Sequence, residues 1–181
     1  MSLKSTPHRY GTIPILIHWV TAVAIFVMLG TGLAATNTFD VAAEAGLVRF
    51  HAILGVCIAL LTLFRIAWWL FFDRRPEDGA TGSRLEHMAA RIVHYGLYLV
   101  ILVMVGSGMA TLITTGGNLV LFGDGGTLPD FTQAPPFTVH GIVARLLLLL
   151  ALGHIGAALL HQFWRRDGLL ARMGLGRSAR V

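Results

Sequence analysis

Four long apolar stretches constrain this chain most, at about residues 12–35, 47–72, 91–113 and 139–164. Each is as long as the roughly 20-residue helix that crosses the hydrocarbon core of a bilayer. Because 55% of the 181 residues are hydrophobic and only 13% are charged, a soluble domain of this size has no interior large enough to bury all four stretches. We therefore expect a single all-α domain, residues 1–181, that forms an integral membrane four-helix bundle surrounded by lipid.

The distribution of lysine and arginine predicts the orientation of this bundle. After four crossings both termini lie on one side, and cytoplasmic segments carry an excess of basic residues. Nearly all basic residues outside or at the ends of the apolar stretches fall on the side of the termini, and only Arg49 falls on the other. Both termini should therefore be cytoplasmic. These flanking residues also account for the net charge of +5, and they argue against nucleic-acid binding.

The last apolar stretch, HGIVARLLLLLALGHIGAALLHQFW, carries three histidines on one helix face. His154 follows His140 by fourteen residues and His161 follows by seven more, so at ~100° per residue all three return to nearly the same face. A rise of ~1.5 Å per residue separates the first two by ~21 Å, against a hydrocarbon core of ~30 Å. His140 and His154 should therefore lie in opposite leaflets.

The membrane histidines sort by depth into two groups. These are His51 and His140 in the periplasmic half, and His18, His94, His154 and, at the cytoplasmic rim, His161. Two neutral imidazoles on opposite sides of a planar iron macrocycle give a six-coordinate, low-spin haem that suits electron transfer. Facing helices of a four-helix bundle supply such pairs. The pattern therefore predicts two b-type haems, one at each depth.

The spacing suggests which histidines ligate each iron. His51 pairs with His140 in the periplasmic half, and for the cytoplasmic half we favour His18 with His154. His94 is able to replace either of the latter two. If it is not a ligand, we expect it to hydrogen-bond to a haem propionate or to another histidine.

Other interpretations of these polar residues fit less well. A zinc site needs three or four ligands at one depth, commonly with a carboxylate or cysteine, and the apolar stretches contain no Asp or Glu. The same absence disfavours proton pumping through carboxylates. Arg65, fourteen residues after His51, either binds a propionate of the cytoplasmic haem or snorkels to the interface.

Several motifs resemble those of the bacterial cytochrome b561 family. They cover nearly the whole chain and comprise IHW at His18, HxxxG from His51 to Gly55 with Arg65 beyond it, HYGLY at His94, HGIVA at His140, GHIGAALLHQFW around His154, and RRDGLLARM. The resemblance implies a small four-helix di-haem protein of the bacterial inner membrane. It assigns His18 and His154 to one haem and His51 and His140 to the other.

Within this family the chain is most similar to members that oxidise periplasmic superoxide to oxygen and reduce ubiquinone. The resemblance makes His161 a candidate at the quinone pocket, where an imidazole suits proton transfer. Superoxide is an anion, and Arg49 is the cation expected beside the periplasmic haem. The alternative is a cytochrome b subunit that exchanges electrons between quinol and a separate redox partner, since the mildly acidic periplasmic loops suit a basic partner.

Overall fold

The structure, a computed structural model, describes residues 2–76, 83–123 and 125–175. Across these residues the chain forms helices and no strand. The long helices are α1 (Thr12–Thr36), α2 (Val41–Ala67), α3 (Arg84–Thr115) and α5 (Pro135–Leu159). π-helical turns extend α2 over Trp68–Phe72 and α5 over Leu160–Arg165, and the short helices are α4 (Gly117–Phe122), a 3-10 turn (Phe131–Gln133) and α6 (Leu169–Arg172).

Among the described residues, four helices are long and apolar enough to cross a membrane. This finding confirms the all-α membrane bundle. Three of these helices begin earlier than the apolar stretches do. Asp40 accepts a hydrogen bond from the backbone N–H of Ala43 at 2.8 Å, Ser83 and Glu86 form a capping box, and Pro135 occupies the first turn of α5. Each cap fixes the start of its helix outside the apolar stretch.

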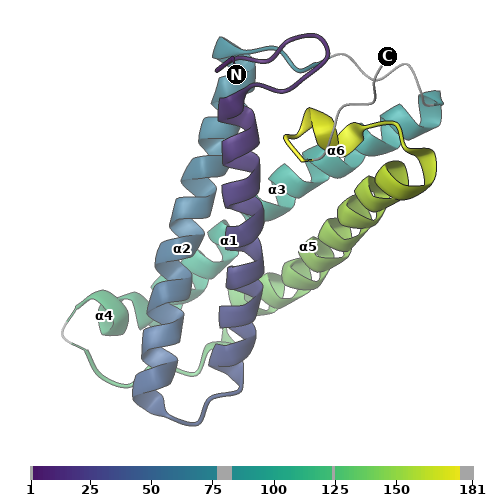
Figure 1. The fold of residues 1–181 in the computed structure, drawn as a ribbon. Helices are drawn as coiled ribbons and strands as arrows, with labels where there is room; N and C mark the ends of the chain where they lie inside the picture. Colours follow the sequence, from purple (N-terminus) through teal and green to yellow (C-terminus); the bar gives the residue numbers. More distant parts are fainter. Residues whose placement is uncertain (1, 77–82, 124, 176–181) are drawn as a thin grey trace.

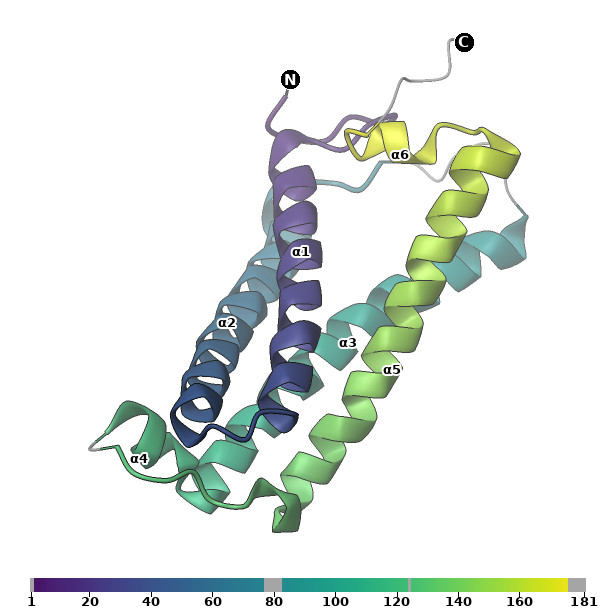
Figure 2. The same cartoon turned by 60° about the horizontal axis from the view of Figure 1, so that its bottom comes forward.

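The helices pack as two antiparallel pairs. α1 packs along α2, α3 packs along α5, and contacts between α2 and α3 join the two pairs. Figures 1 and 2 show that the pairs diverge toward the end where both chain termini lie, and that α6 lies at that end between α1 and α5. Ile58 of α2, Val100 and Ile101 of α3, and Leu147 of α5 form the buried core.

The N-terminal segment and α6 close the end that carries the termini, which we call the terminus end. The indole N–H of Trp19 donates to the carbonyl of Met173 at 3.0 Å, which holds α6 against α1. Asp73, just after α2, accepts hydrogen bonds from the backbone and hydroxyl of Ser5 and from Trp68 and Arg74. Partial burial alone would raise the pKa of the Asp73 carboxyl, but these donors outweigh burial and hold the pKa below its usual value.

The opposite end, which we call the loop end, is covered by the connection between α3 and α5. Phe131 packs against Gly117 at the start of α4, where an added Cβ would lie 2.9 Å from the Phe131 ring. On the other side of α4, the guanidinium of Arg49 stands over the Phe122 ring, 5.7 Å from its centroid. The glycine-rich connection is therefore partly helical and packs on the ends of α2 and α5.

Candidate functional site

The structure brings the predicted histidines together as two pairs at opposite ends of α5. At the loop end, His51 of α2 faces His140 of α5 with ring centroids 6.1 Å apart and an interplanar angle of 66°. At the terminus end, His18 of α1 faces His154 of α5, also at 6.1 Å, with an angle of 69°. We call these the loop-end pair and the terminus-end pair. All four side chains are half-buried within the helices long enough to span a membrane.

The separation within each pair fits two ligands on opposite sides of one metal ion. A metal–imidazole bond of about 2.0–2.1 Å places the ring centroids of two opposed imidazoles about 6 Å apart. Both pairs meet this condition at the same value, 6.1 Å. The residues therefore fit a bis-histidyl iron at each end of α5.

The hydrogen bonds of the loop-end pair favour the tautomers that iron binding requires. The hydroxyl of Thr31 donates to the carbonyl of Met28 at 3.1 Å, so its oxygen accepts from His51 Nδ1 at 3.1 Å. The hydroxyl of Ser107 likewise donates to the carbonyl of Met104 at 3.0 Å and accepts from His140 Nδ1 at 3.2 Å. Both imidazoles then carry the proton on Nδ1, which leaves Nε2 free to bind a metal.

A glycine next to each hydroxyl makes room for the same imidazole. A Cβ added at Gly32 would lie 3.2 Å from His51 Cε1, and a Cβ added at Gly108 would lie 3.1 Å from His140 Cε1. The dipeptides Thr31-Gly32 of α1 and Ser107-Gly108 of α3 therefore act alike. In each, one residue orients a histidine of the neighbouring helix and the next leaves space for its ring.

The terminus-end pair has a third histidine and a cation beside it. His94 of α3 lies 5.1 Å from His154 between centroids, which is closer than two ligands across one iron. Its Nδ1 donates to the carbonyl of Ala90 at 2.7 Å. A guanidinium of Arg65 lies 3.2 Å from His18 Nδ1 and stands over the Tyr98 ring at 5.6 Å.

Arg65 Nη1 is hydrogen-bonded to His18, but Arg65 Nε has no acceptor at this end. Because guanidinium only donates, His18 Nδ1 accepts, and its proton resides on Nε2. If His18 were to hold an iron through Nε2, its proton would have to lie on Nδ1, and Arg65 would need another acceptor. In the described part of the chain, the buried side-chain polar atoms without a partner are Arg65 Nε and the hydroxyls of Thr21 and Thr62. A haem propionate would supply an acceptor for Arg65 Nε, which has none in this structure.

Beyond the terminus-end pair, His161 lies in the π-helical turn that follows α5. Its Nδ1 is 2.5 Å from Asp167 Oδ2, and Asp167 Oδ1 accepts from the backbone N–H of Leu169. Arg166 and Gly168 on either side of Asp167 have positive φ angles of 54° and 74°, which turn the chain back toward His161. Arg165, next to this turn, forms an ion pair with Glu86 of α3.

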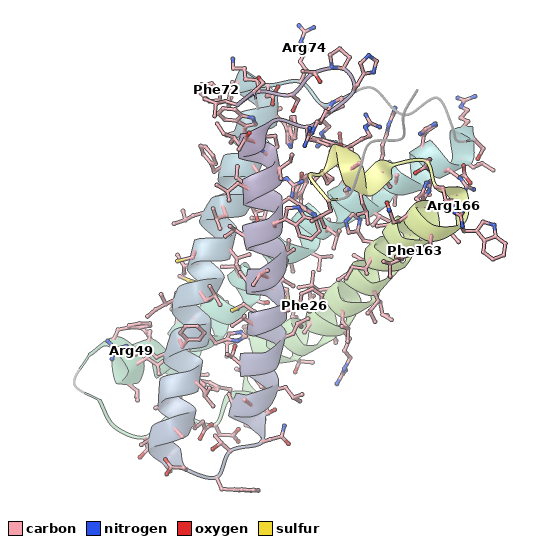
Figure 3. All side chains as sticks on the ribbon, in the orientation of Figure 1. Phe26, Arg49, Phe72, Arg74, Phe163 and Arg166 are labelled. Atoms are coloured by element: carbon pink, nitrogen blue, oxygen red, sulfur yellow. The ribbon has the colours of Figure 1, made fainter. Side chains whose placement is uncertain are left out.

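Arg49 does not contact the loop-end pair. It is exposed and turned toward Phe122 of α4, whereas His51, two residues later, faces Thr31 and His140. Residues two positions apart on a helix point to different faces. Figure 3 shows Arg49 beside α4 at the loop end, with Arg74 and Arg166 at the terminus end.

Four predicted histidines thus occupy two matched pairs on helices that cross a membrane, and this combination defines a class of membrane electron-transfer cytochromes. The family described as prokaryotic cytochrome b561 matches residues 9–176, so the chain belongs to that family. It is 28% identical to cytochrome b561 homolog 2 of Escherichia coli, over 99% of this chain and 97% of that protein. It is 29% identical to cytochrome b562 of Cereibacter sphaeroides, over 91% and 94%. Membership implies b-type haem and electron transfer in a bacterial membrane.

Gly32 and Gly108 lie against the imidazoles of the loop-end pair. Alanine at Gly32 or Gly108 brings a Cβ within 3.1–3.2 Å of an imidazole, so the ring must shift. We expect Gly32→Ala and Gly108→Ala to reduce haem content or to disturb the low-spin spectrum of one haem. Gly30→Ala and Gly106→Ala are matched controls, since a Cβ at either position meets nothing within 4 Å. Equal haem loss in the controls would contradict this prediction.

Proposed function

We propose that this protein carries electrons across the bacterial inner membrane from periplasmic superoxide to ubiquinone through two b haems. His51 and His140 would hold one iron, and His18 and His154 the other. The observation that supports this most is the pair of equal 6.1 Å separations at opposite ends of a single helix. The charge distribution favours cytoplasmic termini, so the loop end faces the periplasm.

The protein supplies rigid ligand positions. When bound, a bis-histidyl b haem supplies reversible one-electron transfer. α5 carries one ligand of each pair, with an axial separation of ~21 Å that is fixed by helix geometry. Thr31 and Ser107 orient the loop-end imidazoles and hold their protons on Nδ1. Imidazoles held in this way would need little rearrangement if the charge on a bound iron changed.

At the loop end, Arg49 is the cation to which we assign the attraction of superoxide. Its exposed guanidinium projects beside α4 and not toward His51, so its role is to attract the anion and not to bind it at the haem ligands. Because exposed charges are screened by salt, this attraction should weaken as ionic strength rises.

At the terminus end, His161 is the candidate for proton delivery to ubiquinone, whose reduction consumes protons. Asp167 accepts from His161 Nδ1, which fixes the ring and leaves Nε2 as the atom that exchanges a proton. Asp167 thereby acts as a positioning residue. The other carboxylate oxygen of Asp167, Oδ1, accepts a hydrogen bond from the backbone N–H of Leu169.

Rapid mixing of the purified holoprotein with potassium superoxide tests this function. We expect the absorption of reduced haem to appear, and then to disappear when a soluble ubiquinone analogue is added. Arg49→Gln should slow the first step at low salt, whereas Arg74→Gln, at the terminus end, should not. If superoxide fails to reduce intact haems while a quinol reduces them, the proposal is wrong, and the protein instead exchanges electrons between quinol and a separate partner.

A further inference from the structure

The two histidine pairs differ in the charge beside them. Arg65 places a guanidinium nitrogen 3.2 Å from His18 Nδ1 in the terminus-end pair. The corresponding Nδ1 atoms of the loop-end pair meet only neutral groups, the hydroxyls of Thr31 and Ser107 and the carbonyl of Met104. One pair therefore has a cation in contact with a ligand, and the other has none.

Arg65 is poorly screened in this position. It lies within a helix long enough to cross the membrane, and its Nε is excluded from solvent. Charges in such an environment act much more strongly than charges at the surface. The basic residues nearest the loop-end pair in sequence, Arg49 and Arg145, are exposed.

No protein carboxylate neutralises Arg65 in the part of the chain that the structure describes. The titratable groups that interact electrostatically with it are His18, His94, His154, Tyr98, Tyr10 and Arg75, and none of them carries a carboxylate. The carboxylate of Asp73, near the end of the same helix, binds Ser5, Trp68 and the backbone of Arg74. Each haem would bring its own propionates, so their charge would not distinguish the two ends, whereas Arg65 is present at only one of them.

We infer that Arg65 gives the haem of the terminus-end pair the higher reduction potential, so that electrons move downhill from the loop-end pair to the terminus-end pair. Reduction adds one electron to the iron, and a nearby cation stabilises that added negative charge. This inference rests on the proposal that each pair holds a haem. Arg65 is a positioning residue here, because it acts through the charge it places beside His18 and not by ligating the iron.

Redox titrations of single-haem proteins, followed by absorption, test this inference. His51→Ala leaves the terminus-end haem, and His154→Ala leaves the loop-end haem. We expect the terminus-end haem, measured in the His51→Ala protein, to have the higher reduction potential. Arg65→Gln in the His51→Ala protein should lower the ratio of reduced to oxidised haem at least tenfold at a fixed potential, which is a shift of 59 mV for one electron.

Two further variants separate charge from shape. Arg65→Lys keeps the charge, so the reduction potential of the terminus-end haem should stay close to its original value. Arg145→Gln removes an exposed arginine of α5 and should change that potential little. An Arg65→Gln protein that keeps its haem and its potential would overturn the inference. If the Arg65→Gln protein does not retain haem, the inference is tested by comparing the potentials of the two single-haem proteins. A higher potential for the loop-end haem would then overturn the inference. Failure of superoxide to reduce the haems bears only on the proposed substrate. A protein that binds a single haem would overturn both proposals.

Discussion

His51→Ala and His140→Ala proteins should each be purified with half the haem of the unmodified protein. The reason is that the two imidazoles face each other at 6.1 Å, and the loss of either leaves an iron with one axial ligand from the protein. Haem per polypeptide, measured as the pyridine complex, gives the count. The double variant should lose no more haem than either single variant, because both changes affect the same site.

His87→Ala is the matched control for this experiment. His87 lies in the first turn of α3, seven residues before His94 and outside the apolar stretch, and its replacement should leave both haems in place. Loss of haem in this variant would mean that alanine substitutions disturb the fold in general. Loss of both haems in His51→Ala but not in His140→Ala would mean that these residues do not share a site.

The second large effect should appear at the terminus end. We expect His154→Ala and His18→Ala to remove the other haem and His94→Ala to retain it. His94 is 5.1 Å from His154, too close for two ligands across one iron, and it is tied to its own helix through Ala90. Haem content and the reduced α-band of each variant provide the measurement.

The roles of His94 and His18 can be distinguished in the same experiment. Nε2 of His94 is free of its proton, whereas Nε2 of His18 carries one as long as Arg65 donates to Nδ1. If His94→Ala loses the haem and His18→Ala keeps it, the terminus-end ligands are His94 and His154. Arg65 would then be a partner of a histidine that does not bind iron.

The sequence predicts the membrane helices well, because the requirement to cross a bilayer leaves a long and unmistakable apolar signal. The spacing of His140 and His154 on one helix likewise reflects a single periodicity, and the structure brings each beside its expected partner. Helix starts were harder to predict. Asp40 and Ser83 lie several residues before the apolar stretches that they cap, because a cap depends on local backbone groups and not on hydropathy.

The sequence alone does not reveal the residues that orient the histidines, and the reason is different. Thr31 and Gly32 belong to α1, yet they act on His51 of α2, so their role depends on how two helices pack. A repeated hydroxyl-glycine dipeptide, TG in α1 and SG in α3, is the signal that was available. Asp167 was missed because it reaches His161 through a turn with positive φ at Arg166 and Gly168, which the sequence signals only at the glycine.

Each histidine pair takes one member from the hairpin of α1 and α2 and the other from α5. Among the long helices, packing between the two halves of the protein runs mainly through α2 and α3, and Figure 2 shows the long helices of the two halves diverging toward the terminus end. Each proposed haem would therefore clamp one hairpin to the other as well as carry an electron. If each pair does hold a haem, assembly of the protein and delivery of its cofactors would be coupled, because each haem would join the two halves at its own end.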